Sequence, residues 1–325
     1  MKFRTGAVRV ALTTALWLIS AFGYASADPL TIVVAYSAGG STDTIARVFA
    51  VRLQDKLGRP VVVEDKPGAT GQIGSRYVAK AAPDGNTIQI AAQTTHAVAP
   101  SLYGKSIGYD PLKDFTPIIQ IAWTPLVLVT NPKFPPTTVK ELIDYLKGKP
   151  SQVSYATGGR GDGSHLSALL FHRLAGVESV AVPFNGEGQA LPPLLGNHVS
   201  YMFLGAPVAG SAIASGDLKA LAVTSKNRSS LLPTVPTLQE SGIPNFDVAN
   251  WWGVFGPAGM PADTINKLNK AFAEIIQEPE TRAKLKGLGF ELTGSTPEDF
   301  RAYVESETRK WAEIIKSEGL APEQN

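Results

Sequence analysis

The chain has 325 residues, enough for two domains, and its 30 lysines and arginines nearly balance 28 aspartates and glutamates. A net charge of +2 argues against nucleic-acid binding, and 44% hydrophobic residues exclude a disordered chain. The absence of cysteine excludes disulfides, thiolate metal sites and a cysteine nucleophile. Because no two of the four histidines have metal-ligand spacing on one helix face, we expect neither a metal nor a cofactor.

The N-terminus has the pattern of an export signal. Three basic residues precede an apolar stretch at 10–22, which is too short to span a bilayer comfortably, and the small residues ASA follow at 25–27. We therefore expect residues 1–27 to be a signal peptide that is cleaved after Ala27. The mature protein is then expected to be soluble and located in a bacterial periplasm.

Strand and helix patterns alternate after this leader. The β-branched run Thr31–Tyr36 predicts a buried strand, and the helix that follows carries one apolar face and takes Ser41 or Thr42 as its N-cap. Further strands are predicted at 61–64 and 87–92, with a helix at 71–82 between them. Strands that alternate with helices predict a parallel sheet with βαβ crossovers.

A long, apolar, extended segment at 118–131, which contains Pro125, predicts a crossing into a second α/β block. That block is expected to hold strands at 153–156, 180–184, 199–203 and 218–224, and helices at 164–174 and 190–196. The extended run Val248–Phe255 returns the chain to the first block, and helices at 262–277, 279–288 and 297–318 close it. We expect one lobe from residues 28–124 plus 250–325, and a second lobe from residues 125–249.

Two glycine-containing loops, each between a strand and a helix, are the candidate ligand sites. In Tyr36–Asp43 (YSAGGSTD), free N–H groups at the helix start and the hydroxyls of Ser41 and Thr42 suit a carboxylate. The alternative for this loop is a plain turn, with Asp43 serving the helix dipole. The loop Thr157–His165 (TGGRGDGSH) has the same architecture in the second block.

In this second loop, Ser164 is the expected N-cap, and His165 is expected to orient the loop rather than to act as a base. A third glycine-rich join at 67–74 is interpreted as close backbone packing before a helix. Thr94 and the pair Phe184-Asn185 follow other strands and are expected to face the cleft. The tryptophans at 123, 251 and 252 are expected to be hinge or core residues.

Taken together, these segments resemble the receptor family of the tripartite tricarboxylate transporters, the Bug-type periplasmic solute-binding proteins. The resemblance covers essentially the whole mature chain. It rests on YSAGGSTD at 36–43, VVEDKPGATGQIG at 62–74, APDG at 82–85, SYATGGRGDGSHL at 154–166, LAVTS at 221–225 with Arg228, VPT at 235–237 with Glu240 and Gly242, and WG followed by GPAG at 252–259.

The resemblance implies a type II, Venus-flytrap fold, in which two three-layer α/β domains are joined by two crossover strands. It also implies capture of a small carboxylate and its delivery to a membrane permease of one large and one small subunit. It implies no enzymatic reaction and no nucleic-acid partner, and we expect a monomer. Two alternatives stay open: a periplasmic sensor that acts through a membrane signalling partner, and, less favoured, a hydrolase that uses Ser164 and His165.

The resemblance further implies that backbone amides and hydroxyls of the two loops hold a ligand carboxyl group. The matching positions are Tyr36, Ala38, Gly39, Gly40, Ser41, Thr42 and Asp43 in the first loop, and Thr157, Gly158, Gly159, Arg160, Gly161, Ser164 and His165 in the second. Thr94, Phe184 and Asn185 complete the expected ligand site. Dicarboxylates, aromatic acids and amino acids all suit it.

This chain departs from the family pattern at three places. Ala38 stands where proline is common, FNG at 184–186 replaces the usual Tyr-Lys-Gly, and Arg160 adds a cation to a loop that is more often neutral. We hypothesise that Arg160 or Asn185 contacts the distal end of the ligand; the alternative is an Arg160 side chain that points to water. If Arg160 pairs with a second carboxylate, Arg160→Ala should weaken a dicarboxylate by about 1.5–3 kcal/mol and spare a monocarboxylate.

Overall fold

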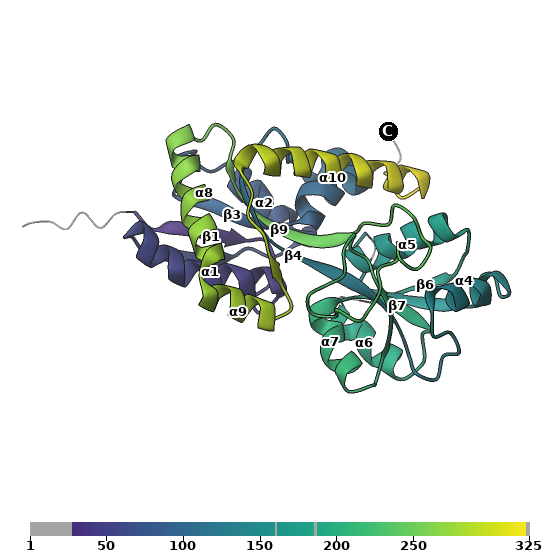
Figure 1. Ribbon diagram of the computed structural model, residues 1–325. Helices are drawn as coiled ribbons and strands as arrows, with labels where there is room; N and C mark the ends of the chain where they lie inside the picture. Colours follow the sequence, from purple (N-terminus) through teal and green to yellow (C-terminus); the bar gives the residue numbers. More distant parts are fainter. Residues whose placement is uncertain (1–27, 160, 185–186, 323–325) are drawn as a thin grey trace, which may run out of the picture.

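The computed structural model describes residues 28–159, 161–184 and 187–322. The expected signal peptide, Arg160 and Asn185 therefore lie outside the described residues. Figure 1 shows two lobes, linked by the strands β4 (Phe115–Thr130) and β9 (Ala249–Pro257). No helix within the described ranges is long and apolar enough to cross a bilayer.

The first lobe is built on a mixed sheet. Its strands β2, β1 and β3 are parallel, β9 pairs antiparallel with β3, and β4 pairs antiparallel with β9. Helices α1 and α8 meet on one face of this sheet, where the ring centroids of Phe49 and Phe272 are 5.3 Å apart. Its elements are β1 (Leu30–Val34), α1 (Ser41–Leu57), β2 (Val61–Asp65), η1 (Ala69–Gly71), α2 (Gln72–Ala79), β3 (Thr87–Ala92), η2 (Thr94–Val98), α3 (Ala99–Tyr103), η3 (Gly104–Ile107), α8 (Ala262–Gln277), α9 (Pro279–Gly287), β10 (Glu291–Leu292) and α10 (Pro297–Ser317).

The second lobe continues from the far end of β4. Strands β7 and β8 pair antiparallel with this part of β4, and β5 lies parallel between β7 and β6. The elements of the lobe are α4 (Val139–Lys147), β5 (Ser154–Thr157), α5 (Gly163–Ala175), β6 (Val180–Pro183), α6 (Glu187–Leu195), β7 (Tyr201–Gly205), α7 (Ala206–Ala214) and β8 (Lys219–Val223).

Strand β4 changes partners at Pro125. Pro125 is the last residue that pairs with β9, and Leu126 is the first that pairs with β7. Proline has no N–H to donate to a ladder, so Pro125 contributes no such hydrogen bond at this step. The Thr224 hydroxyl accepts a hydrogen bond from the Leu126 N–H (2.9 Å) and donates one to the Val248 carbonyl (2.7 Å). Thr224 thus joins the two crossing segments at the same level.

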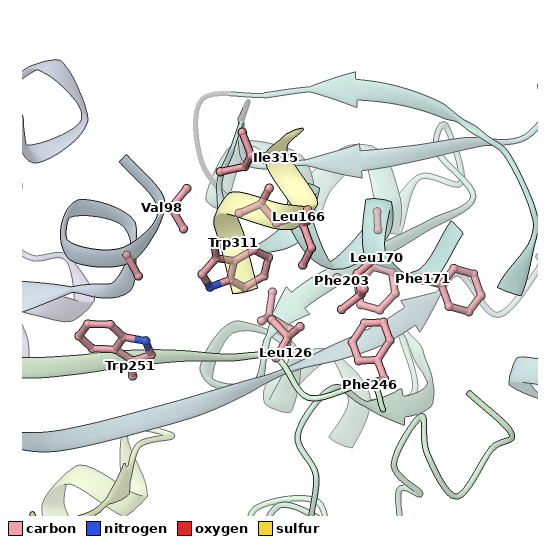
Figure 2. Packing of buried hydrophobic residues seen from close by; sticks show 14 of the residues in the cluster. Val98, Leu126, Leu166, Leu170, Phe171, Phe203, Phe246, Trp251, Trp311 and Ile315 are labelled. Carbon is pink, nitrogen blue, oxygen red and sulfur yellow. The ribbon is translucent and has the colours of Figure 1, made fainter. Parts of the chain in front are cut away.

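The largest hydrophobic cluster extends across both lobes. Figure 2 shows Trp311 of α10 between Trp251 of the first lobe and Leu166 of the second, and Ile315 of α10 belongs to the same cluster. These four side chains are all buried, and Phe171 of α5 continues the cluster into the second lobe. The C-terminal helix α10 therefore packs against both lobes, as its course in Figure 1 also shows.

Candidate functional site

A cavity of about 360 Å³ lies between the lobes. The first lobe contributes Tyr36, Gly40, Ser41, Thr42, Thr70, Ala92, Gln93, Thr94 and Thr124 to its wall, and the second lobe contributes Gly158, Asp162, Gly163, Glu187, Gly205, Pro207 and Val208. The returning segment adds Asn250, Trp251 and Trp252. Most of these residues follow the carboxyl ends of strands β1, β3, β5 and β7, where α/β proteins bind their ligands.

The loop Tyr36–Asp43 is organised by its own acidic residue. The Gly39 N–H donates to Asp43 Oδ2 (2.7 Å), and Arg47 Nε pairs with Asp43 Oδ1 (2.7 Å). Burial alone would raise the pKa of Asp43, but the hydrogen bonds from Arg47 and Gly39 hold this pKa below its ordinary value. Asp43 therefore stays charged and shapes the loop from behind the cavity wall.

The expectation that Ser41 or Thr42 caps helix α1 is wrong, because the N-cap is Gly40, which has no side chain to bond the first turn. The Thr42 hydroxyl instead accepts a hydrogen bond from Trp252 Nε1 (2.9 Å). The first amides of a helix have no intrahelical acceptor and carry partial positive charge. Because Ser41 and Thr42 line the cavity, this end of α1 offers it N–H and hydroxyl donors suited to a carboxylate.

The loop before α5 is built differently. Its N-cap is Asp162 and not Ser164, because the Asp162 carboxylate accepts the His165 N–H (2.8 Å) in addition to the Ser164 hydroxyl (2.7 Å). Ser164 is fully buried and its Oγ accepts the Gly158 N–H (2.8 Å). His165 Nδ1 accepts the Gly161 N–H (3.2 Å), a contact in keeping with the expectation that His165 orients the loop. The N-terminus of α5 is thus already occupied by a carboxylate of the chain itself.

Two carboxyl groups, Asp162 and Glu187, line the second-lobe side of the cavity. Burial raises the pKa of Asp162 to about 6, against the hydrogen bonds from His165 and Ser164. Burial and the charge of Asp162 together raise the pKa of Glu187 to about 7, although Glu187 Oε1 accepts the Gly205 N–H (3.0 Å). No lysine, arginine or histidine is among the described residues of the wall, so these acids lack a basic partner there.

A buried carboxylate of α10 positions part of the first-lobe wall. Glu307 Oε2 accepts hydrogen bonds from Gln93 Nε2 (2.9 Å), Trp251 Nε1 (3.3 Å) and Trp311 Nε1 (3.1 Å), while Oε1 pairs with Lys310. Gln93 and Trp251 line the cavity, and Glu307 is only 5% exposed. Glu307 therefore connects the cavity wall to α10 by hydrogen bonds.

The structure brings together part of the expected site. Of the residues named from the sequence, Tyr36, Gly40, Ser41, Thr42, Thr94 and Gly158 lie in the cavity wall. Outside the described wall are Ala38, Gly39, Asp43, Thr157, Gly159, Gly161, Ser164, His165 and Phe184, the last of which packs against a hydrophobic cluster of the second lobe. Arg160 and Asn185 fall outside the described residues.

We did not predict from the sequence that the carboxyl groups of Asp162 and Glu187, or the segment at 250–252, line the cavity. Asp162 lies inside a loop that we singled out, but its carboxyl group received no role, and Glu187 follows a predicted strand by only three residues. Trp251 and Trp252 are buried, as expected of core residues, yet they also line the cavity. The third glycine-rich join does pack closely, because a Cβ on Gly74 would lie 2.8 Å from Ala35 Cα, but Thr70 within it reaches the cavity.

Known proteins resemble this chain over most of its length. A family model described as the tripartite tricarboxylate transporter family receptor matches residues 45–320. BugT of Bordetella pertussis is 35% identical over 293 residues, which cover 90% of each protein. The structure resembles that of R. palustris Rpa4515 with adipate (TM-score 0.80, 35% identity, 90% of this chain and 98% of that one).

It also resembles MatC from Rhodopseudomonas palustris with bound malate (TM-score 0.76, 34% identity, 88% of this chain and 98% of that one). A third similar structure is the periplasmic binding protein BugD (TM-score 0.76, 37% identity, 90% of this chain and 98% of that one). These similarities confirm the two-lobed α/β fold and the family resemblance. The chain belongs to the receptor family of the tripartite tricarboxylate transporters, as a Bug-type solute-binding protein.

Proposed function

We propose that this protein captures a small organic carboxylate in the cavity between its lobes and delivers it to a tripartite tricarboxylate transporter. The observation that carries the proposal is the open N-terminus of α1, where Ser41 and Thr42 present donors to the cavity between the lobes. Related proteins have been solved with adipate and with malate, which are both small carboxylates. The membrane partner is proposed to consist of one large and one small subunit.

Ligand binding should close the two lobes onto each other. The wall draws residues from both lobes, so only a closed form lets a ligand contact all of them. We propose that residues 28–124 plus 250–325 move as one body and residues 125–249 as the other, with the hinge at Pro125. We also propose that the protein is a periplasmic monomer, exported by a signal peptide that is cleaved after Ala27.

The proposed receptor performs no reaction on its ligand. A serine hydrolase needs an accessible hydroxyl with a histidine as its base. Ser164 is fully buried and donates to Asp162, and His165 Nδ1 accepts a backbone N–H, so neither side chain is arranged for attack. This geometry supports a binding role over the hydrolase alternative. A Ser164→Ala variant should have no ester turnover to lose.

The role of the α1 N-terminus can be tested with a matched pair of variants. Ser41→Ala removes only the hydroxyl, whereas Ser41→Pro also removes the N–H at the first helical position, where proline suits the backbone. Affinity for a carboxylate found in a thermal-shift screen is then measured by titration calorimetry. We expect Ser41→Pro to lose at least about tenfold more affinity than Ser41→Ala. Equal affinities would contradict a carboxylate site at this helix end.

Transport is tested in the cell. A strain that lacks the gene should fail to grow on the identified carboxylate as sole carbon source, and the gene carrying Ser41→Ala should restore growth better than the gene carrying Ser41→Pro. Normal growth together with loss of a transcriptional response to the ligand would instead support the sensor alternative.

A further inference from the structure

We propose that the ligand carries a protonated amine in addition to its carboxylate, and that Glu187 binds this amine. The inference rests on the proposed function, because it concerns the same cavity. It assigns the ligand to the amino carboxylates, and it assigns Glu187 the role of a specificity-determining residue.

The two sides of the cavity differ in charge. The first-lobe side presents the open N-terminus of α1 and neutral side chains such as Gln93 and Thr94. The second-lobe side presents the carboxyl groups of Asp162 and Glu187. A ligand with one negative and one positive end matches this division, with its carboxylate at α1 and its ammonium group toward the two acids.

Among the described residues, a hydrogen-bond donor reaches only one of the two carboxylate oxygens of Glu187. Oε1 accepts the Gly205 N–H, whereas no described residue donates a hydrogen bond to Oε2. A Cβ on Gly205 would lie 2.9 Å from this Oε2, so the glycine makes room for the carboxyl group. Asp162 differs, because Ser164 and His165 already bond its oxygens. We therefore assign the contact with the amine to Glu187. Asp162 adds a second negative charge nearby.

The electrostatics of the cavity favour a cation over a second anion. Burial opposes ionisation of Asp162, and burial together with the charge of Asp162 opposes ionisation of Glu187, so the described residues around them compensate these charges poorly. A dicarboxylate would bring a further negative charge beside them, whereas an ammonium group would supply the missing compensation and charge-assisted hydrogen bonds. The competing explanation is that Glu187 only complements the dipole of α6, whose first residue it is.

The experiment uses ligand pairs that differ in one group: succinate with β-alanine, glutarate with γ-aminobutyrate, and malate with aspartate. Affinities are measured by titration calorimetry for the wild type, for Glu187→Gln, which keeps the Oε1 acceptor, and for Asp162→Asn, which keeps a good N-cap. Glu313→Gln is the matched control, because this glutamate is exposed on α10 outside the cavity. Circular dichroism verifies the fold of each variant.

We expect the wild type to prefer an amino carboxylate over its dicarboxylate partner. Glu187→Gln should weaken this ligand at least about tenfold, Asp162→Asn should weaken it less, and Glu313→Gln should leave it unchanged. A preference for dicarboxylates that disappears in Arg160→Ala would overturn the inference and leave the proposed function standing. Equal affinity of the amino carboxylate for wild type and Glu187→Gln would also overturn it. If protein that has been freed of ligand binds no carboxylate at all, both proposals are overturned.

Discussion

Replacement of Glu187 by glutamine should stabilise the ligand-free protein above neutral pH. Burial and the charge of Asp162 raise the pKa of Glu187 from 4.5 to about 7 in the folded protein. The folded protein then holds a proton that the unfolded chain releases at lower pH. Unfolding stability must therefore fall as the pH rises from about 4.5 to about 7, and the full loss is present above this range.

The size of this effect follows from the shift. At 1.36 kcal/mol per pKa unit, the rise from 4.5 to about 7 corresponds to roughly 3 kcal/mol. The side chain is only partly buried and opens onto the cavity, so solvent screening reduces this value and we expect about 1–2 kcal/mol. Loss of a negative charge from the first turn of α6 opposes the gain by about 0.3–1 kcal/mol.

The assay is urea unfolding of the ligand-free wild type, Glu187→Gln and the exposed control Glu313→Gln across this pH range. At about pH 4.5, Glu187→Gln should have the same free energy of unfolding as the wild type or a slightly lower one. At about pH 8, its free energy of unfolding should be higher than that of the wild type. The control should follow the wild type. Parallel profiles for wild type and Glu187→Gln would refute the argument, because they would show that the carboxyl group has the same pKa in the folded and unfolded states.

Three further predictions concern the packing around the cavity. Gly74→Ala should cost about 1–3 kcal/mol of unfolding free energy, because the new Cβ would lie 2.8 Å from Ala35 Cα. Gly210→Ala in α7 has open space around the new Cβ and should raise the unfolding free energy by up to about 1 kcal/mol. Equal effects of the two substitutions in urea unfolding would contradict this contrast. Thr42→Val should cost about 1–3 kcal/mol by leaving the buried Trp252 N–H unpaired, and Thr42→Ser, which keeps the acceptor, should restore most of it. Glu307→Ala should cost about 3–5 kcal/mol of unfolding free energy and shift the tryptophan emission, because it removes the acceptor shared by Gln93, Trp251 and Trp311. An unchanged emission spectrum would show that these donors find other partners.

The strand–helix alternation was predictable because its signals are local. Strand β3 and helix α8 have the predicted bounds, and β1 and β2 differ from prediction by one or two residues at an end. Helix α4 was missed although Thr138 and Glu141 form a capping pair, in which the Thr138 hydroxyl accepts the Glu141 N–H (3.1 Å). Helix α7 gives a weak signal because it consists mainly of small residues and lacks a marked apolar face.

The site was less predictable because its residues come from segments far apart in the sequence. Glu187 and Trp252 meet at one cavity only after both lobes are formed, and no local pattern links them. Asp162 could have been recognised, since aspartate is among the preferred N-cap residues. We predicted Ser164 as the N-cap instead, two residues after the actual N-cap.

The two loops that look alike in the sequence differ in what they offer a ligand. Both join a strand to a helix through glycines, and both therefore predicted an anion site at a helix N-terminus. Gly40 caps α1 without a side chain, so the amides of its first turn stay open toward the cavity. Asp162 caps α5 with its own carboxylate and uses the His165 N–H, so an anion is already present there. One residue at the N-cap thus decides whether a helix end binds a carboxylate or supplies one, and it makes the cavity receptive to opposite charges at its two ends.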